Sequence, residues 1–179
     1  MSYSASIGFL YGLQKHGIKL GLETIEVMLA RLGRPHDRYR TLHIGGTNGK
    51  GSTATMAAAV LQASGYRVGL YTSPHLVDFR ERIRVNGDPI SEECVSELIA
   101  RLQEVIGSSL QPTFFEFTTA LAFQYFFDSG VDVAVVEVGM GGRFDATTAI
   151  APLVSVITTV ALDHQEYLGH TVGAIAFEK

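Results

Sequence analysis

The chain has 179 residues, with 14 Lys and Arg against 18 Asp and Glu, and 46% of its residues are hydrophobic. This composition is typical of a globular domain, and the net charge of −4 argues against a nucleic-acid partner, which usually binds a basic face. No stretch approaches the roughly 20 apolar residues of a membrane span, so we expect no membrane association. The single cysteine, Cys94, and the lack of a signal-peptide pattern predict a reducing, cytoplasmic location.

Hydrophobic periodicity predicts alternating helices and strands in the first half of the chain. Apolar residues at helical spacing cover 22–32, a short strand covers 41–44, and a helix covers 50–64. The next strand covers 66–72. An alternating segment at 80–90 contains an Asn-Gly dipeptide and predicts a hairpin excursion.

The second half of the chain continues the alternation. Ser91 is a good N-cap for a helix, and an apolar helix covers 115–129. The β-branched runs at 131–138 and 153–160 are typical of strands buried on both faces, and another helix begins around Thr171. We therefore predict an α/β fold with a mostly parallel sheet flanked by helices.

The segment GTNGKGST, residues 46–53, lies between an expected strand and an expected helix. Such a loop lets backbone amides and the helix N-terminus surround a phosphate, which Lys50 would reach as a point charge. The match to the general P-loop pattern is imperfect, because Gly45 is one residue away from the leading glycine position and Gly51 follows the lysine. The alternative is a tight structural turn. The residues expected to bind a nucleotide are Thr47, Asn48, Gly49, Lys50, Gly51, Ser52 and Thr53.

Six further segments carry recognisable motifs: IKLGLETI at 18–25, YTSPHLVDFRERIRVNG at 71–87, TFFEFTTALAF at 113–123, EVGMGGRFDATT at 137–148, ALDHQEYLGHT at 161–171 and IAFEK at 175–179. Together with the glycine loop, they resemble the folylpolyglutamate synthase and dihydrofolate synthase family of the Mur ligase superfamily. Thr148 stands where that family commonly has asparagine. The resemblance stops at Lys179, so we expect residues 1–179 to be a truncated P-loop NTPase-like Mur ligase central domain, the N-terminal ATP-binding part, without the C-terminal ligase domain. A sheet truncated in this way should expose apolar edges.

The resemblance implies an ATP-dependent ligase that adds L-glutamate to folate, and to dihydropteroate in the dihydrofolate synthase reaction. It implies ATP and Mg²⁺ as cofactors, an acyl phosphate intermediate, and a monomeric full-length parent. We expect the 179-residue piece to bind ATP–Mg²⁺ but to be inactive alone. Two alternatives are a nucleotide-binding module without catalysis and a Mur-type ligase of cell-wall precursors. The TSPHL and GKGS segments favour the folate branch.

The resemblance also assigns catalytic and metal-binding residues. Lys50 would stabilise the γ-phosphoryl oxygens, and Lys179 matches a family lysine that can be carbamylated, although as the last residue it is not expected to be held in place. Glu137 closes a buried strand, where a carboxylate is costly unless a cation or a salt bridge accompanies it. The resemblance makes Glu137, Ser73 and His164 magnesium ligands. Chemistry alone favours a core or hydrogen-bonding role for the histidine, and the alternative for the serine is a turn-forming residue before Pro74.

Substrate-binding residues are expected where the family binds the pterin. Phe115 can stack on a flat ring, and the carboxylates of Glu116 and Asp145 can accept hydrogen bonds from ring amino groups. The alternative for Phe115 and its neighbour Phe117 is the core of an apolar helix. His75 is a further candidate in the substrate loop.

Overall fold

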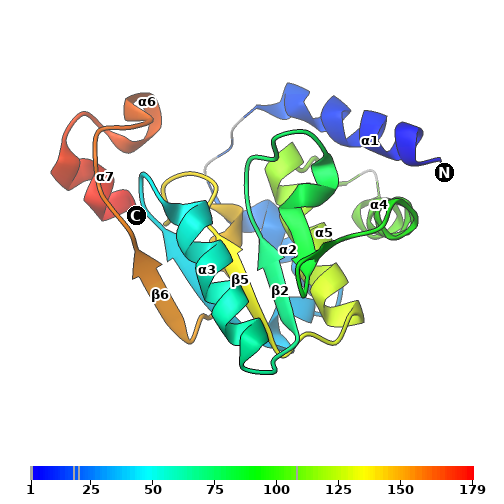
Figure 1. The fold of residues 1–179 in the computed structure, drawn as a ribbon. Helices are drawn as coiled ribbons and strands as arrows, with labels where there is room; N and C mark the ends of the chain where they lie inside the picture. Colours follow the sequence, from blue (N-terminus) through cyan, green and yellow to red (C-terminus); the bar gives the residue numbers. More distant parts are fainter. Residues whose placement is uncertain (1, 18, 20, 108) are drawn as a thin grey trace.

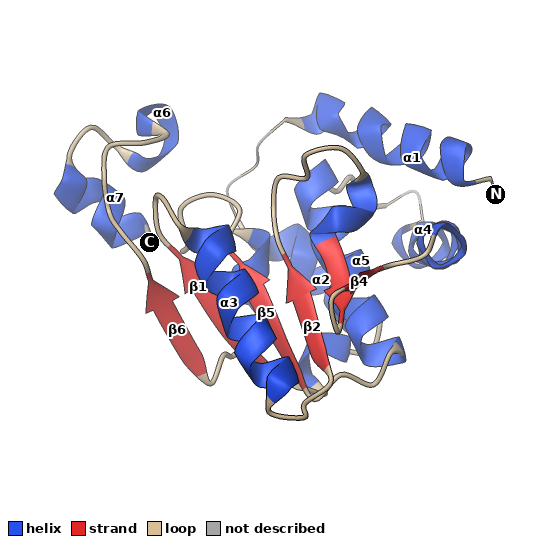
Figure 2. Cartoon of the chain, in the orientation of Figure 1, coloured by secondary structure: helices blue, strands red, loops and turns tan. Residues whose placement is uncertain are grey.

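The computed structural model describes residues 2–17, 19, 21–107 and 109–179. Ile18 and Leu20 of the IKLGLETI motif therefore lie outside the described residues. Within the described part, one six-stranded sheet is covered by helices on both faces (Figures 1 and 2). The predicted α/β class is confirmed.

The elements follow one another along the chain in a largely alternating order. The strands are β1 Arg40–Gly45, β2 Val68–Tyr71, β3 Ile83–Val85, β4 Asp88–Pro89, β5 Val133–Glu137 and β6 Val154–Ile157. The α-helices are α1 Tyr3–Gly12, α2 Glu23–Arg31, α3 Lys50–Ala63, α4 Glu92–Ile106, α5 Phe114–Asp128, α6 Gln165–Leu168 and α7 Val172–Glu178. Short 3₁₀ helices are η1 Leu13–His16, η2 Pro35–Asp37, η3 Phe79–Arg82 and η4 Ala146–Ala149.

The strand order in the sheet is β4-β3-β2-β5-β1-β6. Strands β2, β5, β1 and β6 are parallel, with Ile44 of β1 opposite Glu137 of β5, while β3 and β4 are antiparallel additions at one side. The predicted Asn-Gly turn joins β3 to β4, and Asn86 and Gly87 both have positive φ, of 50° and 87°. The mostly parallel sheet places the carboxyl ends of its four parallel strands at one edge.

Side-chain caps start three of the helices, at the predicted Ser91, near the predicted start at Thr171, and at Thr113, one residue before α5. The hydroxyl oxygen of Ser91 accepts a hydrogen bond from the Cys94 amide at the start of α4. The hydroxyl of Thr113 caps α5 in a capping box, and Thr171 caps α7. These bonds satisfy backbone N–H groups that have no partner inside the helix.

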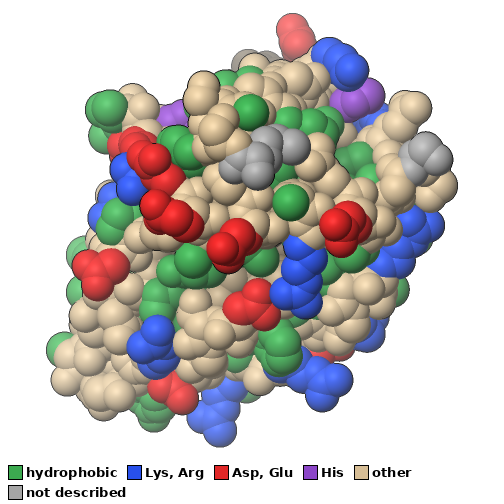
Figure 3. All heavy atoms as spheres, turned by 90° about the vertical axis from the view of Figure 1, so that its right-hand side faces the viewer, with side chains coloured by type: hydrophobic (Ala, Val, Ile, Leu, Met, Phe, Trp, Pro, Cys, Tyr) green, Lys and Arg blue, Asp and Glu red, His purple; other side chains and the backbone are tan. Residues whose placement is uncertain are grey.

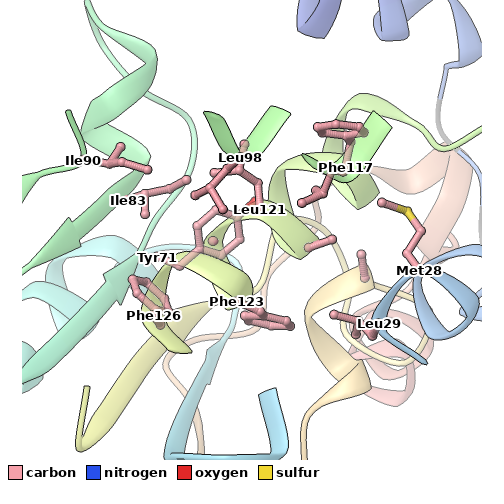
Figure 4. Close-up of a cluster of buried hydrophobic side chains, with 14 of the residues drawn as sticks. Met28, Leu29, Tyr71, Ile83, Ile90, Leu98, Phe117, Leu121, Phe123 and Phe126 are labelled. Atoms are coloured by element: carbon pink, nitrogen blue, oxygen red, sulfur yellow. The ribbon is translucent and has the colours of Figure 1, made fainter. Parts of the chain in front are cut away.

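The two faces of the sheet pack against different helices. Along β5, Val133 and Val135 face α3, whereas Ala134 and Val136 face the larger cluster built on α5. This alternation follows from the two-residue period of a strand. The larger cluster joins α1, α2, α4 and α5 to the sheet, and Figure 4 shows Phe117, Phe123 and Phe126 of α5 within it. Helix α5 is therefore buried between this face of the sheet and the helices that cover it.

Strand β6 differs from its prediction. The β-branched run at 153–160 was expected to be buried on both faces, but only Val154–Ile157 form a strand, and Leu153 is 64% exposed. The reason is position: among the described strands β6 pairs only with β1 and lies at the edge of the sheet. Its side chains match the expectation of an exposed apolar edge.

The surface carries charges of both signs. On the side of the molecule that lies at the right of Figure 1, acidic and basic side chains lie next to one another (Figure 3). Among the described residues, no helix combines the length and the apolar character that crossing a membrane would require.

Candidate functional site

The glycine loop joins the carboxyl end of β1 to the N-terminus of α3, as predicted. Gly46 and Gly49 have φ of 133° and 82°, a region that side chains rarely adopt. A Cβ at Gly46 would also overlap the hydroxyl of Thr158. Gly49 is the N-cap of α3 and supplies no side-chain cap, so the helix N-terminus directs its amides and partial positive charge toward the loop.

The loop is fastened to the segment that follows β6. The amide of Thr47 donates to the Thr159 carbonyl at 2.7 Å, and the Thr158 hydroxyl donates to the Asn48 carbonyl at 2.7 Å. The amide of Ala161 donates to the Thr47 hydroxyl at 3.1 Å. The loop conformation is thus set by contacts from a segment more than 100 residues later in the chain.

Two lysine ammonium groups meet at this loop. Lys50 Nζ donates to the carbonyls of Gly46 and Thr47 at 3.0 and 3.1 Å. Lys179 Nζ donates to the same Gly46 carbonyl at 2.9 Å, so the expectation that Lys179 would not be held in place is wrong. Helix α7 carries Lys179 to the loop, and burial together with the neighbouring Lys50 charge lowers the pKa of Lys179.

Glu137 and Ser73 are brought into direct contact. Glu137 ends β5, is 4% exposed, and accepts a hydrogen bond from the Ser73 amide at 3.0 Å. A Cβ at Gly51 of α3 would lie 3.4 Å from the Glu137 carboxylate. Burial raises the pKa of Glu137, and the Ser73 amide and the Lys50 charge oppose the rise. The carboxylate therefore lies between the phosphate-loop helix and the segment after β2.

His164 lies in a different setting. It has a left-handed backbone conformation before α6, is exposed, and its Nε2 is 3.6 Å from Asp163 Oδ2. It forms no hydrogen bond or ion pair with Glu137 or Ser73, and the described residues contain no group of three His, Cys, Asp or Glu side chains that could hold a metal ion. Of the three predicted metal ligands, the structure brings two together.

A pocket of about 270 Å³ opens beside Ser73. Phe115 of α5 lines it and lies 6.1 Å from the ring of Tyr71. Gly139 allows this arrangement, because a Cβ there would lie 2.5 Å from the Phe115 ring. All three predicted substrate-binding residues, Phe115, Glu116 and Asp145, line this pocket.

The two pocket carboxylates already accept hydrogen bonds. Glu116 Oε2 accepts from the Thr113 amide at 2.7 Å and completes the capping box of α5. Asp145 accepts from the amides of Met140 and Thr147 at 2.9 and 3.0 Å, and burial raises its pKa. Both carboxylates therefore also have structural roles.

A polar chain behind the pocket was not expected from the sequence. The Thr147 hydroxyl bonds Asp145 Oδ1 at 2.5 Å and lies 2.8 Å from Nε2 of His43 on β1. Burial lowers the pKa of His43 to about 4. A histidine inside a short strand carries no local signal of such a partner.

Arg82 and its partner His75 also reach the site. Arg82 lines the pocket, and its Nε donates to His75 Nδ1 at 2.7 Å. Burial and the Arg82 charge lower the pKa of His75, so this imidazole is a neutral acceptor near pH 7. His75 was a candidate, but Arg82 was not, because an arginine in an alternating strand segment is more often solvated.

Known proteins resemble this chain both in sequence and in fold. The family model of the Mur ligase middle domain matches residues 44–179. The chain is 47% identical to a probable bifunctional folylpolyglutamate synthase/dihydropteroate synthase of Haloferax volcanii, covering 100% of this chain and 22% of the relative. It is 43% identical to a dihydrofolate synthase/folylpolyglutamate synthase of Bacillus subtilis, covering 99% and 43%. The structure of Escherichia coli FolC in complex with DHPP and ADP superposes with a TM-score of 0.95, at 37% identity over 99% of this chain and 43% of that one. The chain thus spans less than half the length of each.

Proposed function

Because this chain belongs to the Mur ligase family, we propose that it is the nucleotide- and acid-binding part of an ATP-dependent ligase. The ligase joins L-glutamate to folate or dihydropteroate and acts as a monomer. One observation carries the proposal: the Glu137 carboxylate contacts the Ser73 amide beside the pocket and adjoins Gly51 of the phosphate loop. A nucleotide phosphate on the loop and an acid in the pocket would therefore meet at Glu137.

The chemistry suits this arrangement. The γ-phosphoryl group of ATP transfers to a carboxylate oxygen of the acid, ADP leaves, and the glutamate amine then displaces phosphate from the acyl phosphate. Phosphoryl transfer depends on charge neutralisation and in-line positioning. Lys50 supplies a positive charge at the loop, and the α3 N-terminus supplies amides. Lys179 adds a second ammonium at Gly46, and its lowered pKa increases the neutral fraction that can react with CO₂.

The donor set near the loop fits Mg²⁺. Glu137 offers a buried carboxylate and Ser73 a hydroxyl, both hard oxygen ligands of the type that Mg²⁺ prefers. When bound, the ion would neutralise charge on the phosphate oxygens. His164 is exposed, offers nitrogen and pairs with Asp163, so the geometry supports the other two residues more strongly as ligands.

The pocket suits a flat, polar ring. Phe115 contributes an aromatic ring to the lining, and Asp145 and Glu116 contribute carboxylates. Gly139 leaves room for the Phe115 ring, because a Cβ at this position would lie 2.5 Å from it. The pterin ring of the acid would bind there, with the carboxylate at the other end of the acid directed toward Glu137 and the phosphate loop.

Calorimetric titration with ATP and Mg²⁺ tests the nucleotide site. Lys50→Ala should weaken binding by about tenfold or more, because a charge-assisted contact to phosphate is lost. Lys15→Ala is the matched control, since Lys15 is exposed on η1 and should bind as the wild type does. Equal binding by wild type and Lys50→Ala would contradict the proposal.

A second assay tests the ligase reaction. The whole protein should form ADP only when both folate and glutamate are present. The 179-residue chain is expected to bind ATP–Mg²⁺ without this turnover, because the relatives have more than twice its length. ADP formation by the chain alone that depends on both substrates would contradict this part.

A further inference from the structure

Arg82 is a buried cation on the wall of the pocket. It ends η3, is 8% exposed, and lines the pocket with Ser73 and Asp145. Its guanidinium carbon lies 5.3 Å from the ring centroid of Phe114. Its Nε donates to the neutral His75 at 2.7 Å. Two neutral partners therefore position the guanidinium plane.

Arg82 has no carboxylate partner among the described residues, since none of their ion pairs includes it. The nearby carboxylates accept hydrogen bonds from other donors: Glu81 from the amides of Leu76, Val77 and Asp78, Glu116 from Thr113, Asp145 from Met140 and Thr147, and Glu137 from Ser73. The positive charge of Arg82 is thus left without a direct counter-ion in this part of the chain.

The two Nη nitrogens of Arg82 make no hydrogen bond to any residue in the described part of the chain. Neither is a fully buried polar atom without a partner. Because Arg82 lines the pocket, these nitrogens are the donors that it can offer to a ligand there. Lys19 also lines this pocket, and its Nζ donates to the Gln111 carbonyl. The lining thus includes two cationic side chains in addition to its aromatic and acidic residues.

A buried charge is costly unless it is paired, and a guanidinium is suited to a carboxylate because two parallel N–H groups match its two oxygens. We propose that Arg82 binds the carboxylate of the acid substrate and that His75 is a positioning residue that fixes the guanidinium plane. This rests on the proposed function, which places that acid in the pocket. Arg82 would thereby hold the carboxylate on the side of the pocket where Ser73 and Glu137 lie.

The test compares an acid with its neutral counterpart. Binding of pteroate and of its carboxamide is measured by calorimetry for wild type, Arg82→Gln, Arg82→Lys and the control Arg84→Gln on β3. Wild type and the control should prefer the acid by about tenfold, because a hydrogen-bonded charge pair is lost in the amide. Arg82→Gln should lose this preference, and Arg82→Lys should keep part of it because it retains the charge without the planar fork. A purely structural role would weaken acid and amide equally.

Several outcomes would overturn the proposal. These are an acid preference in Arg82→Gln equal to that of wild type, no preference in wild type, or no pteroate binding at all. A fall in ATP affinity in Arg82→Gln with pteroate binding unchanged would show that the anion is a phosphate and would also overturn it. If Arg82→Gln fails to fold, an unreduced preference in Arg82→Lys has the same meaning. ATP titration of Lys50→Ala is a separate readout, so the nucleotide site can hold while the Arg82 proposal fails.

Discussion

His43 should make the stability of this chain depend on pH. Its side chain meets Thr147 behind the pocket, and burial lowers its pKa from 6.5 to about 4. Because the folded pKa lies below the unfolded one, acidification protonates the unfolded chain first. The stabilisation is therefore fully present above pH 6.5 and is lost as the pH falls toward 4.

The size of the effect follows from the two pKa values. Relative to pH 7.5, the loss is about 2 kcal/mol at pH 5 and about 3 kcal/mol at pH 4, as upper bounds for one site. Asp145 acts in the opposite direction, because burial raises its pKa and acid then favours the folded state. Comparison of wild type with His43→Gln isolates the histidine, since glutamine can still hydrogen-bond Thr147 but does not titrate there.

Urea unfolding at pH 5.0 and 7.5 measures the difference. Wild type should lose more free energy of unfolding than His43→Gln between the two pH values, by up to about 2 kcal/mol. His170→Gln, which changes an exposed histidine, should follow the wild type. The same pH dependence in wild type and His43→Gln would refute the reasoning.

Three substitutions test close packing and capping. Gly69→Ala would place a Cβ 2.7 Å from the buried Phe126 ring, so the free energy of unfolding in urea should fall by about 1–3 kcal/mol; an unchanged value would show that the ring can move. Thr113→Val removes the hydroxyl cap of α5 and should cost about 1 kcal/mol in the same assay, with no loss if another group caps the helix. Gly139→Ala would push the Phe115 ring at 2.5 Å, so calorimetry should show weaker pteroate binding with ATP affinity retained; unchanged pteroate binding would mean that the ring does not form the binding wall.

Much of the fold could be predicted because its signals are local. The Asn86-Gly87 turn, the Ser91 and Thr171 caps and the strand–loop–helix around Lys50 each depend on a few neighbouring residues. The exposure of the β6 side chains could not be predicted. A β-branched run shows that a strand forms, but its burial depends on which elements pack against it, and β6 pairs with β1 alone.

The site likewise combines features that a local sequence pattern indicates with contacts between residues far apart in the chain. The place of Glu137 at the end of a buried strand, a local property, indicated that it lies at the ligand-binding edge of the sheet, whereas its role as a magnesium ligand came from the resemblance and stays a prediction. The contact between His43 and Thr147 joins residues 104 positions apart, and Lys179 reaches a carbonyl 133 positions away. Such contacts exist only after the sheet and α7 have assembled, so no nearby pattern in the sequence announces them.

The fastening of the phosphate loop to the segment after β6 has a consequence for local opening. When the edge strand opens, the Thr159 carbonyl and the Thr158 hydroxyl leave the loop, and the loop loses the bonds that fix its shape. A ligand that binds only the closed loop must therefore slow amide hydrogen exchange in β6 by a factor of 1 + [L]/Kd, without touching that strand. The exchange rate of an exposed edge strand thus reports occupancy of a site formed on the neighbouring β1.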